Sequence, residues 1–183
     1  MEAVIPRKRV LILGSTGMLG HVIYNVLQNQ SNIELFDMSF RTKLTKKSII
    51  CDVSKVDTLE KQIKKINPVV IVNCVGVLLK NSKINPANTI FINSYLPHKL
   101  RDIAVKINAR VIQISTDCVF NGNRGHNSEN TLPNASDIYG RSKSLGELNN
   151  SFDLTIRTSI IGPELKHNGE GLLHWLFNQS GNI

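Results

Sequence analysis

Aromatic residues are scarce in this sequence, and it contains no long hydrophobic run. Phe, Trp and Tyr together make up 5% of the 183 residues. No apolar stretch approaches the roughly 20 residues that a membrane-spanning helix requires, and residues 1–9 lack the apolar core and cleavage site of a signal peptide. We therefore expect a cytoplasmic protein with no membrane association.

Cysteine is also rare. Cys51, Cys74 and Cys118 are odd in number and widely spaced, and each lies within or beside an apolar run. Such usage is typical of neither a disulfide framework nor a zinc site. We expect three reduced thiols and no bound metal.

Acidic residues are outnumbered by basic ones, which gives a formal net charge of +8. Much of the excess lies at 41–47 and 61–65, in a pattern typical of solvated surface that favours anionic ligands. No basic stripe is interleaved with aromatic residues, so we expect no nucleic-acid partner. With 41% hydrophobic and 20% charged residues, the chain has the composition of one globular domain.

Short apolar runs alternate with longer segments of helical periodicity. The first run, Val10 to Leu13, is continuously apolar, as in a strand buried on both faces. Strands are expected at 10–13, 33–37, 48–51, 69–72, 111–114 and 154–158. Helices are expected to include 19–27, 56–66, 92–107 and 138–150. The alternation predicts an α/β fold, a doubly wound parallel sheet with helices on both faces.

Two segments depart from this alternation. Residues 117–137 are rich in Asn, Gly, Ser and Pro, which predicts a long surface loop able to lie over a ligand. Residues 159–183 are expected to form a loop and one amphipathic segment around 172–176. We therefore separate residues 1–158, which hold the sheet, from residues 159–183.

A glycine-rich turn joins the first expected strand to the first helix. Its sequence is Gly14-Ser15-Thr16-Gly17-Met18-Leu19-Gly20. Gly14 permits a tight turn, Gly17 lets the backbone approach a pyrophosphate, and Gly20 allows the helix to pack closely on the strand. The N-terminus of the helix offers unpaired N–H groups to an anion. Because strand, turn and helix are in register, a dinucleotide site in a Rossmann-like fold is favoured over a purely structural turn.

Two residues near the end of the second expected strand bear on the choice of dinucleotide. Asp37 lies about 20 residues beyond the glycines, where a carboxylate usually accepts hydrogen bonds from ribose hydroxyls, as in NAD sites. Arg41 could instead hold a 2′-phosphate. Both NAD and NADP therefore remain open as cofactors.

A tyrosine and a lysine lie four residues apart in Tyr139-Gly140-Arg141-Ser142-Lys143, and so on one helix face. An ammonium beside a phenol favours phenolate and brings its pKa nearer to neutral pH, where acid–base chemistry is useful. The isolated pair is common on protein surfaces. Its position after the fifth expected strand favours a functional role.

Ser115, Thr116 and Asp117 follow that fifth strand directly. In an open parallel sheet, this edge faces the ligand crevice. The Thr116 hydroxyl can donate a hydrogen bond to a substrate oxygen there, although such hydroxyls also cap loops. We favour the functional role because of the neighbouring glycine and tyrosine motifs.

Together these residues resemble a known family, the extended short-chain dehydrogenase/reductases, and within it the group of dTDP-4-dehydrorhamnose reductase. The resemblance rests on eight ordered segments: 14–20, 51–53, 72–76, 92–93, 114–120, 121–122, 139–143 and 156–159. It implies that Tyr139 donates a proton, that Lys143 binds the nicotinamide ribose and lowers the tyrosine pKa, and that Thr116 orients the substrate carbonyl. It also implies further cofactor contacts by Asp52, Val53, Cys74, Val75, Gly76 and Asn93.

The implied activity is NAD(P)H-dependent reduction of a keto-sugar nucleotide, used in making deoxysugars for surface polysaccharide. In related dehydratases the threonine is followed by Asp and Glu, whereas here Asp117 precedes Cys118, which favours reduction over dehydration. A sugar-nucleotide epimerase stays an alternative. Another is a non-catalytic, dinucleotide-binding regulatory subunit, because the β subunit of methionine adenosyltransferase resembles the same family.

Two departures from the family pattern concern the substrate. Cys118 and Ile160 stand where the reductases usually have aromatic residues, so the sugar contacts differ. Such enzymes also have roughly a hundred further residues forming a substrate lobe. We therefore expect 1–158 to be the NAD(P)-binding domain with the catalytic residues, and 159–183 to be the start of a truncated substrate-binding region. Family members often form homodimers, so a homodimer is also expected.

Overall fold

Six parallel strands form one sheet in the computed structural model, which describes residues 6–166 and 169–179. The order of the strands across the sheet is β3-β2-β1-β4-β5-β6. Their bounds are β1 Lys8–Leu13, β2 Ile33–Ser39, β3 Ile49–Ile50, β4 Val70–Asn73, β5 Arg110–Ile114 and β6 Leu154–Ile156. The order reverses between β1 and β4, and in doubly wound sheets ligands bind outside the carboxyl ends of the strands at this point. The predicted fold class is confirmed.

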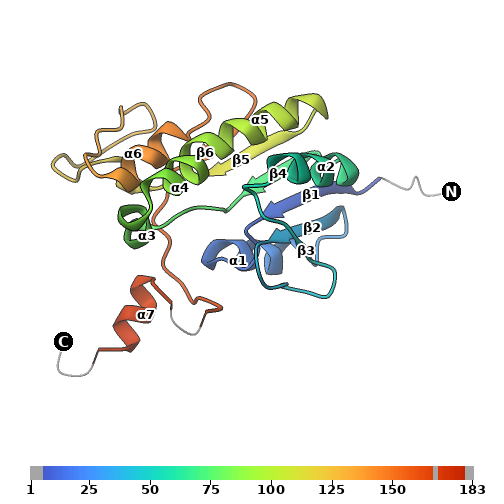
Figure 1. Ribbon diagram of the computed structural model, residues 1–183, viewed down its shortest axis with the longest axis horizontal. Helices are drawn as coiled ribbons and strands as arrows, with labels where there is room; N and C mark the ends of the chain where they lie inside the picture. Colours follow the sequence, from blue (N-terminus) through green and yellow to red (C-terminus); the bar gives the residue numbers. More distant parts are fainter. Residues whose placement is uncertain (1–5, 167–168, 180–183) are drawn as a thin grey trace.

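Helices connect the strands and cover the sheet. Their bounds are α1 Met18–Leu27, α2 Val56–Ile66, α3 Leu79–Ile84, α4 Pro86–Ile90, α5 Leu96–Lys106, α6 Ile138–Leu145 and α7 Leu172–Phe177. A π-helical segment, η1 (Phe91–Tyr95), links α4 to α5, and a short 3₁₀ turn, η2 (Asp117–Val119), follows β5. In Figure 1, α2 and α5 lie on one side of the sheet and α1 on the other, while α7 lies apart from the sheet.

The apolar run in β1 contributes to both hydrophobic clusters of the protein. Leu11 and Leu13 pack into the larger cluster with residues of α2 and α5, and Val10 and Ile12 pack into the smaller one against α1. Leu11, Ile12 and Leu13 are fully buried. Each such side chain contributes about 1.5–3 kcal/mol of burial free energy. The strand buried on both faces is therefore confirmed, and it fixes the glycine turn that follows it.

The helix expected over 138–150 is shorter in the structure and ends at Leu145. The backbone tightens after that residue, because the amides of Gly146 and Glu147 donate to the carbonyls three residues earlier, at Lys143 and Ser144. The expected helix over 92–107 is α5 from Leu96 on, while its first residues belong to the π-helical η1, and α4 precedes both. Asn85 caps α4 by accepting from the Asn88 amide, so Asn85-Pro86 marks a helix start that the apolar periodicity alone does not reveal.

The expected loop over 117–137 is confirmed, apart from η2 at its start. Its two ends are tied together, since the amides of Asn134 and Ala135 each donate to the Val119 carbonyl at 3.0 Å. The amphipathic segment expected near 172–176 is the helix α7. Residues 180–183 of the expected C-terminal stretch lie outside the described residues.

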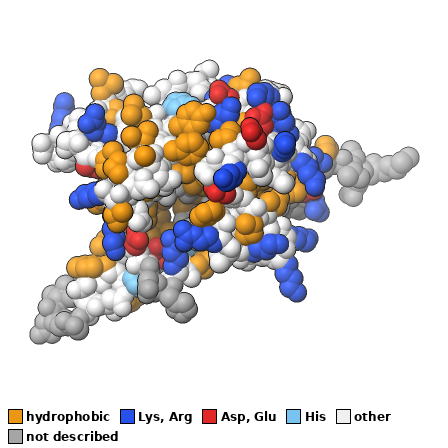
Figure 2. All heavy atoms as spheres, viewed as in Figure 1, with side chains coloured by type: hydrophobic (Ala, Val, Ile, Leu, Met, Phe, Trp, Pro, Cys, Tyr) orange, Lys and Arg blue, Asp and Glu red, His pale blue; other side chains and the backbone are white. Residues whose placement is uncertain are grey.

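The basic groups noted in the sequence are exposed on the surface. Lys43, Lys46 and Lys47 follow β2, and Lys61, Lys64 and Lys65 lie on α2. Figure 2 shows Lys and Arg side chains gathered over the side of the molecule that carries these elements. None of the described helices has the length and apolar character needed to cross a membrane.

Candidate active site

The glycine turn between β1 and α1 is built by close backbone packing. Gly14 has a φ of +79°, in the left-handed region that favours glycine. A Cβ on Gly20 would lie 2.2 Å from the Gly14 carbonyl oxygen, so a larger residue would push α1 away from the turn. The roles predicted for Gly14 and Gly20 therefore have a geometric basis. Gly17 begins α1, and no side chain caps the amides of its first turn.

Asp37 and Arg41 occupy different environments. Asp37 lies within β2, is 3% exposed, and accepts a 2.6 Å hydrogen bond from the Ser15 hydroxyl. Arg41 lies beyond the end of β2 on the wall of the main cavity, with its guanidinium 5.1 Å from the centre of the Phe40 ring. The Ser15–Asp37 bond holds the glycine turn to β2, while Arg41 lines the cavity.

Thr116, Tyr139 and Lys143 come together where β5 meets α6. The Thr116 hydroxyl accepts from the Cys118 amide at 3.2 Å and donates to Asp117 Oδ1 at 3.1 Å. The Thr116 and Tyr139 side chains line the same cavity. Lys143 lies one turn along α6 from Tyr139, and its Nζ donates to the Ile114 carbonyl at 2.6 Å. The structure thus brings the three predicted catalytic residues to one strand end.

The pKa of Tyr139 does not follow the direction expected from the sequence. Burial raises the phenol pKa, and the nearby Thr116 hydroxyl lowers it by less. The lysine was expected to lower this pKa, but its ammonium is turned to the Ile114 carbonyl. Tyr139 is therefore a neutral phenol at pH 7, which is the form able to donate a proton.

Lys143 is 6% exposed, and burial lowers its pKa to about 8. The carboxylate of Glu147 acts in the opposite direction and raises the Lys143 pKa. Cys74, which lines the cavity nearby, has a pKa raised to about 12, mainly by burial. The site at pH 7 therefore contains a largely protonated amine beside a neutral thiol.

Asn93 lies in η1 and supports the opposite wall of the site. Its side chain accepts from the Val77 amide at 2.8 Å and donates to the Val77 carbonyl at 3.0 Å and to Ser142 Oγ at 3.1 Å. It therefore ties the segment after β4 to α6. Gly76, in that segment, is close to the catalytic amine, because a Cβ on it would lie 3.8 Å from Lys143 Nζ. Val75 lies in the same segment, and its amide donates to Asn73 Oδ1 at 3.2 Å.

Asp52 and Val53 follow β3. The Asp52 carboxylate accepts from the Ser54 amide at 2.9 Å. The Ser54 side chain, and then this amide, hold the Asp52 pKa below the usual value. Val53 is partly buried against the larger hydrophobic cluster. Their predicted contact with adenine stays a prediction.

One cavity of about 840 Å³ joins the glycine turn to Thr116 and Tyr139, while Lys143 is not among the residues that line it. It runs from the start of α1 past Arg41 and the ends of β4 and β5 to the segment after β6. The predicted site residues on its wall are Thr16, Gly17, Met18, Leu19, Arg41, Cys74, Gly76, Thr116 and Tyr139. This volume is within the range of small-molecule and cofactor sites.

Three charged residues at this edge were given no role from the sequence. Asp117 lines the cavity, and the Ser159 hydroxyl, the largest influence on its pKa, holds that pKa below the usual value. Glu147 and Arg157 form an ion pair behind Ser115. The sequence signal that could have identified them is a charged residue within or beside an otherwise apolar segment. A charged side chain is rarely buried unless it is paired.

Comparisons with known proteins find relatives in sequence and in fold. The β subunit of methionine adenosyltransferase 2 from Bos taurus is 29% identical over 97% of this chain. A hypothetical dTDP-4-dehydrorhamnose reductase from Sulfolobus tokodaii superposes with a TM-score of 0.77 and 28% identity over 82% of the chain. A dTDP-4-dehydrorhamnose reductase from Bacillus anthracis, solved in complex with NADP, gives a TM-score of 0.71 and 24% identity over 83%.

The chain spans about half the length of these proteins, 54% of the bovine subunit, 55% of the Sulfolobus chain and 54% of the Bacillus chain. The family model described as the RmlD substrate binding domain matches residues 8–173, which include the whole sheet and every residue of the predicted catalytic trio. This chain therefore belongs to the RmlD substrate binding domain family.

Proposed function

We propose that this chain binds NADPH and carries the proton-donating site of a reductase that acts on a keto-sugar nucleotide, in deoxysugar synthesis for surface polysaccharide. The observation that carries the proposal is the single cavity that joins the uncapped start of α1 to Thr116 and Tyr139. A dinucleotide lying in it would extend from the glycine turn to a neutral phenol.

The residues present fit such a cofactor. The first-turn amides of α1 have no side-chain cap and are suited to a pyrophosphate. Arg41 offers a guanidinium for a 2′-phosphate, while Asp37 is already bonded to Ser15, and this contrast favours NADPH over NADH. The NADP bound to the Bacillus relative is consistent with this choice. Lys143, beside Gly76, is placed to hold the nicotinamide ribose.

The chemistry divides between the cofactor and the chain. When bound, the reduced nicotinamide supplies a hydride. Tyr139 donates its phenolic proton to the carbonyl oxygen of the substrate, and burial favours the protonated form that this step requires. Thr116, which lines the cavity with Tyr139, orients the same oxygen.

The acid–base groups favour reduction over elimination of water. Asp117 is held as a carboxylate by the Ser159 and Thr116 hydroxyls. The next residue, Cys118, has a pKa raised mainly by burial, so it is not a second carboxylate-like base at neutral pH. One carboxylate and one phenol supply the single proton of a carbonyl reduction but not the paired proton shuttle of a dehydratase.

The direct test is turnover of NADPH by the chain with nucleotide-linked 4-keto sugars. We expect loss of NADPH absorbance and a product two hydrogens heavier by mass spectrometry. An epimerase would give a product of unchanged mass. Tyr139→Phe should lower the rate by at least about 100-fold while NADPH affinity stays within about threefold. Undiminished turnover by this variant would remove Tyr139 from the mechanism.

A second candidate is a dinucleotide-binding regulatory subunit without catalysis. The similarity to a methionine adenosyltransferase β subunit, over 97% of this chain, favours it. In that case the chain should bind NADPH and co-elute in a fixed ratio with a methionine adenosyltransferase catalytic subunit. It should also leave NADPH unoxidised with every 4-keto sugar nucleotide offered.

A further inference from the structure

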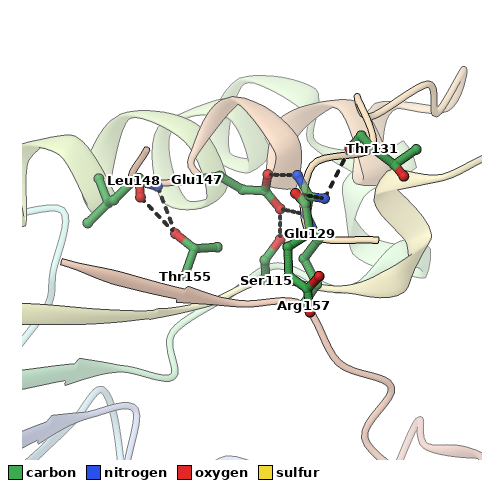
Figure 3. Close-up of polar contacts among 7 residues, drawn as sticks. All are labelled: Ser115, Glu129, Thr131, Glu147, Leu148, Thr155 and Arg157. Atoms are coloured by element: carbon green, nitrogen blue, oxygen red, sulfur yellow. Dashed lines mark hydrogen bonds and ion pairs between the residues drawn. The ribbon is translucent and has the colours of Figure 1, made fainter. Parts of the chain in front are cut away.

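A buried ion pair lies directly behind the strand end that carries Thr116. Arg157 Nε and Nη2 donate to the two oxygens of Glu147 at 2.8 and 2.7 Å, a bidentate arrangement. The Glu147 side chain is 2% exposed and that of Arg157 is 20% exposed. Figure 3 shows the pair between the turn that follows α6 and the segment that follows β6.

The pair makes two further contacts that reach the site. Ser115 Oγ donates to Glu147 Oε1 at 2.7 Å, which attaches the residue before Thr116 to the carboxylate. Arg157 Nη1 donates to the carbonyls of Glu129 and Thr131, at 3.3 and 3.2 Å, and so holds the loop over 120–137. Three separate segments, the strand end, the loop and the turn after α6, thus meet at one ion pair (Figure 3).

The neighbouring contacts make this arrangement rigid. Thr155 Oγ1 accepts from the Leu148 amide at 2.9 Å, which fastens the turn after Glu147 to β6 (Figure 3). The Ser115 amide donates to the Ile156 carbonyl at 2.8 Å. The guanidinium of Arg157 also lies 5.2 Å from the centre of the Phe120 ring. A fully bonded network of this kind favours one arrangement of its segments over others.

We propose that Glu147 and Arg157 are positioning residues of the candidate active site: as one ion pair they fix Ser115 and Thr116 at the end of β5 and hold the 129–131 segment beside them. The role in catalysis rests on the reductase function proposed above. The positioning itself is a property of the folded chain and is testable without turnover.

The charge of Glu147 also acts on the catalytic amine, in support of the positioning role. It follows Lys143 by four residues, and its negative charge favours the ammonium form. The other groups around the amine are the Cys74 thiol, the Ile114 carbonyl and Tyr139 one turn earlier on α6. Burial lowers the Lys143 pKa, and Glu147 is the carboxylate that raises it.

The chain contains a matched control for this pair. Asp153 and Arg101 form a second ion pair in which the carboxylate is fully buried, and Asp153 also accepts from the Val111 amide at 2.8 Å. Val111 lies near the start of β5, whereas Thr116 follows its end. Asp153→Asn therefore removes an equally buried charge without touching the catalytic edge.

The experiment compares Glu147→Gln, Arg157→Lys and Asp153→Asn in the isolated chain. Exchange of the Ser115 amide, which donates to the Ile156 carbonyl, and of the Thr131 amide, which donates to the Ser128 carbonyl, should accelerate by about tenfold or more in the first two variants. Both variants lose the bidentate pair. Asp153→Asn should leave the exchange of these two amides unchanged. Equal acceleration in the control variant, or none in either pair variant, would overturn the positioning role.

A second measurement follows the charge on Lys143. In protein labelled with ¹³C-lysine, the side-chain signal of Lys143 is assigned with Lys143→Met and titrated by NMR. Glu147→Gln should lower its apparent pKa by about half a unit or more, and Asp153→Asn should not. An unchanged Lys143 titration in Glu147→Gln would contradict the electrostatic role. If that variant does not fold, Ser115→Ala should accelerate exchange of the amide at position 115 while the Thr131 amide stays protected, and failure to do so would count against the network.

Where NADPH oxidation is detected, Arg157→Lys should lower kcat by about tenfold or more with KM changed less than threefold. Absence of turnover in the parent chain would refute the reductase function alone, because the exchange and titration measurements do not depend on it.

Discussion

Lys143→Met should make the protein more stable at neutral pH while removing a residue of the proposed site. The lysine is 6% exposed, and burial lowers its pKa from 10.5 to about 8. At pH 7 the folded protein therefore holds a charged amine in a poorly solvated place, which lowers its stability. Methionine fills a similar volume without a charge.

The magnitude follows from the two pKa values. Below pH 8 both folded and unfolded chains bind the proton, and the difference of 2.5 pKa units costs the folded state about 3.4 kcal/mol at pH 7. Between pH 8 and 10.5 the unfolded chain keeps a proton that the folded chain has lost, so the stability of the parent protein rises with pH. By pH 9.5 the cost falls to about 1.4 kcal/mol.

Urea unfolding of parent and variant at pH 7 and pH 9.5 measures this difference. The stability of the variant relative to the parent should decrease by about 2 kcal/mol between these pH values, since groups common to both proteins cancel. The control is Lys106→Met. Lys106 is exposed, and its hydrogen bond to Glu60 raises its pKa, so this variant should show no stabilisation at pH 7. A pH-independent difference between Lys143→Met and the parent would refute the argument.

Three further predictions concern the cofactor half of the site. Arg41→Gln should weaken NADPH binding by about tenfold, because a charge-assisted hydrogen bond to the 2′-phosphate is lost. It should weaken NADH binding by less than about twofold, and fluorescence titration compares the two affinities. Gly20→Ala should destabilise the fold by about 2 kcal/mol or more in urea unfolding, since the added Cβ would lie 2.2 Å from the Gly14 carbonyl oxygen. Asp37→Asn should lower the free energy of unfolding by about 1–3 kcal/mol, because it weakens the bond to Ser15. Calorimetry should show a change in NADH affinity of less than about threefold. A larger loss of affinity would identify Asp37 as a ribose ligand.

Local sequence patterns predicted the positions of most elements because each reflects a local physical requirement. The run from Val10 to Leu13 is apolar since both faces of β1 are covered. Asn67-Pro68 ends α2, and Asn67 has the left-handed conformation that often follows a helix. Thr116, Tyr139 and Lys143 could be grouped because strand ends and helix spacing are both readable from sequence.

The remaining features depend on contacts between distant residues. The bond from Ser15 to Asp37 joins residues 22 positions apart and changes what the carboxylate is free to bind. The pKa of Tyr139 depends on burial and on the direction of the Lys143 side chain, neither of which the i,i+4 spacing specifies. The bonds of Glu147 to Ser115 and Arg157 likewise arise from the fold.

The π-helical segment at 91–95 adjusts the winding of a helical stretch that runs without a break from Pro86 to Lys106. One added residue turns an α-helix by about 100°. The wider π-helical turn therefore lets both parts of this stretch face their partners. Asn93 points toward Val77, and Leu96 and Leu100 point toward the sheet. Deleting a single residue from this turn would make the winding regular, but one of these two surfaces would then face the wrong way.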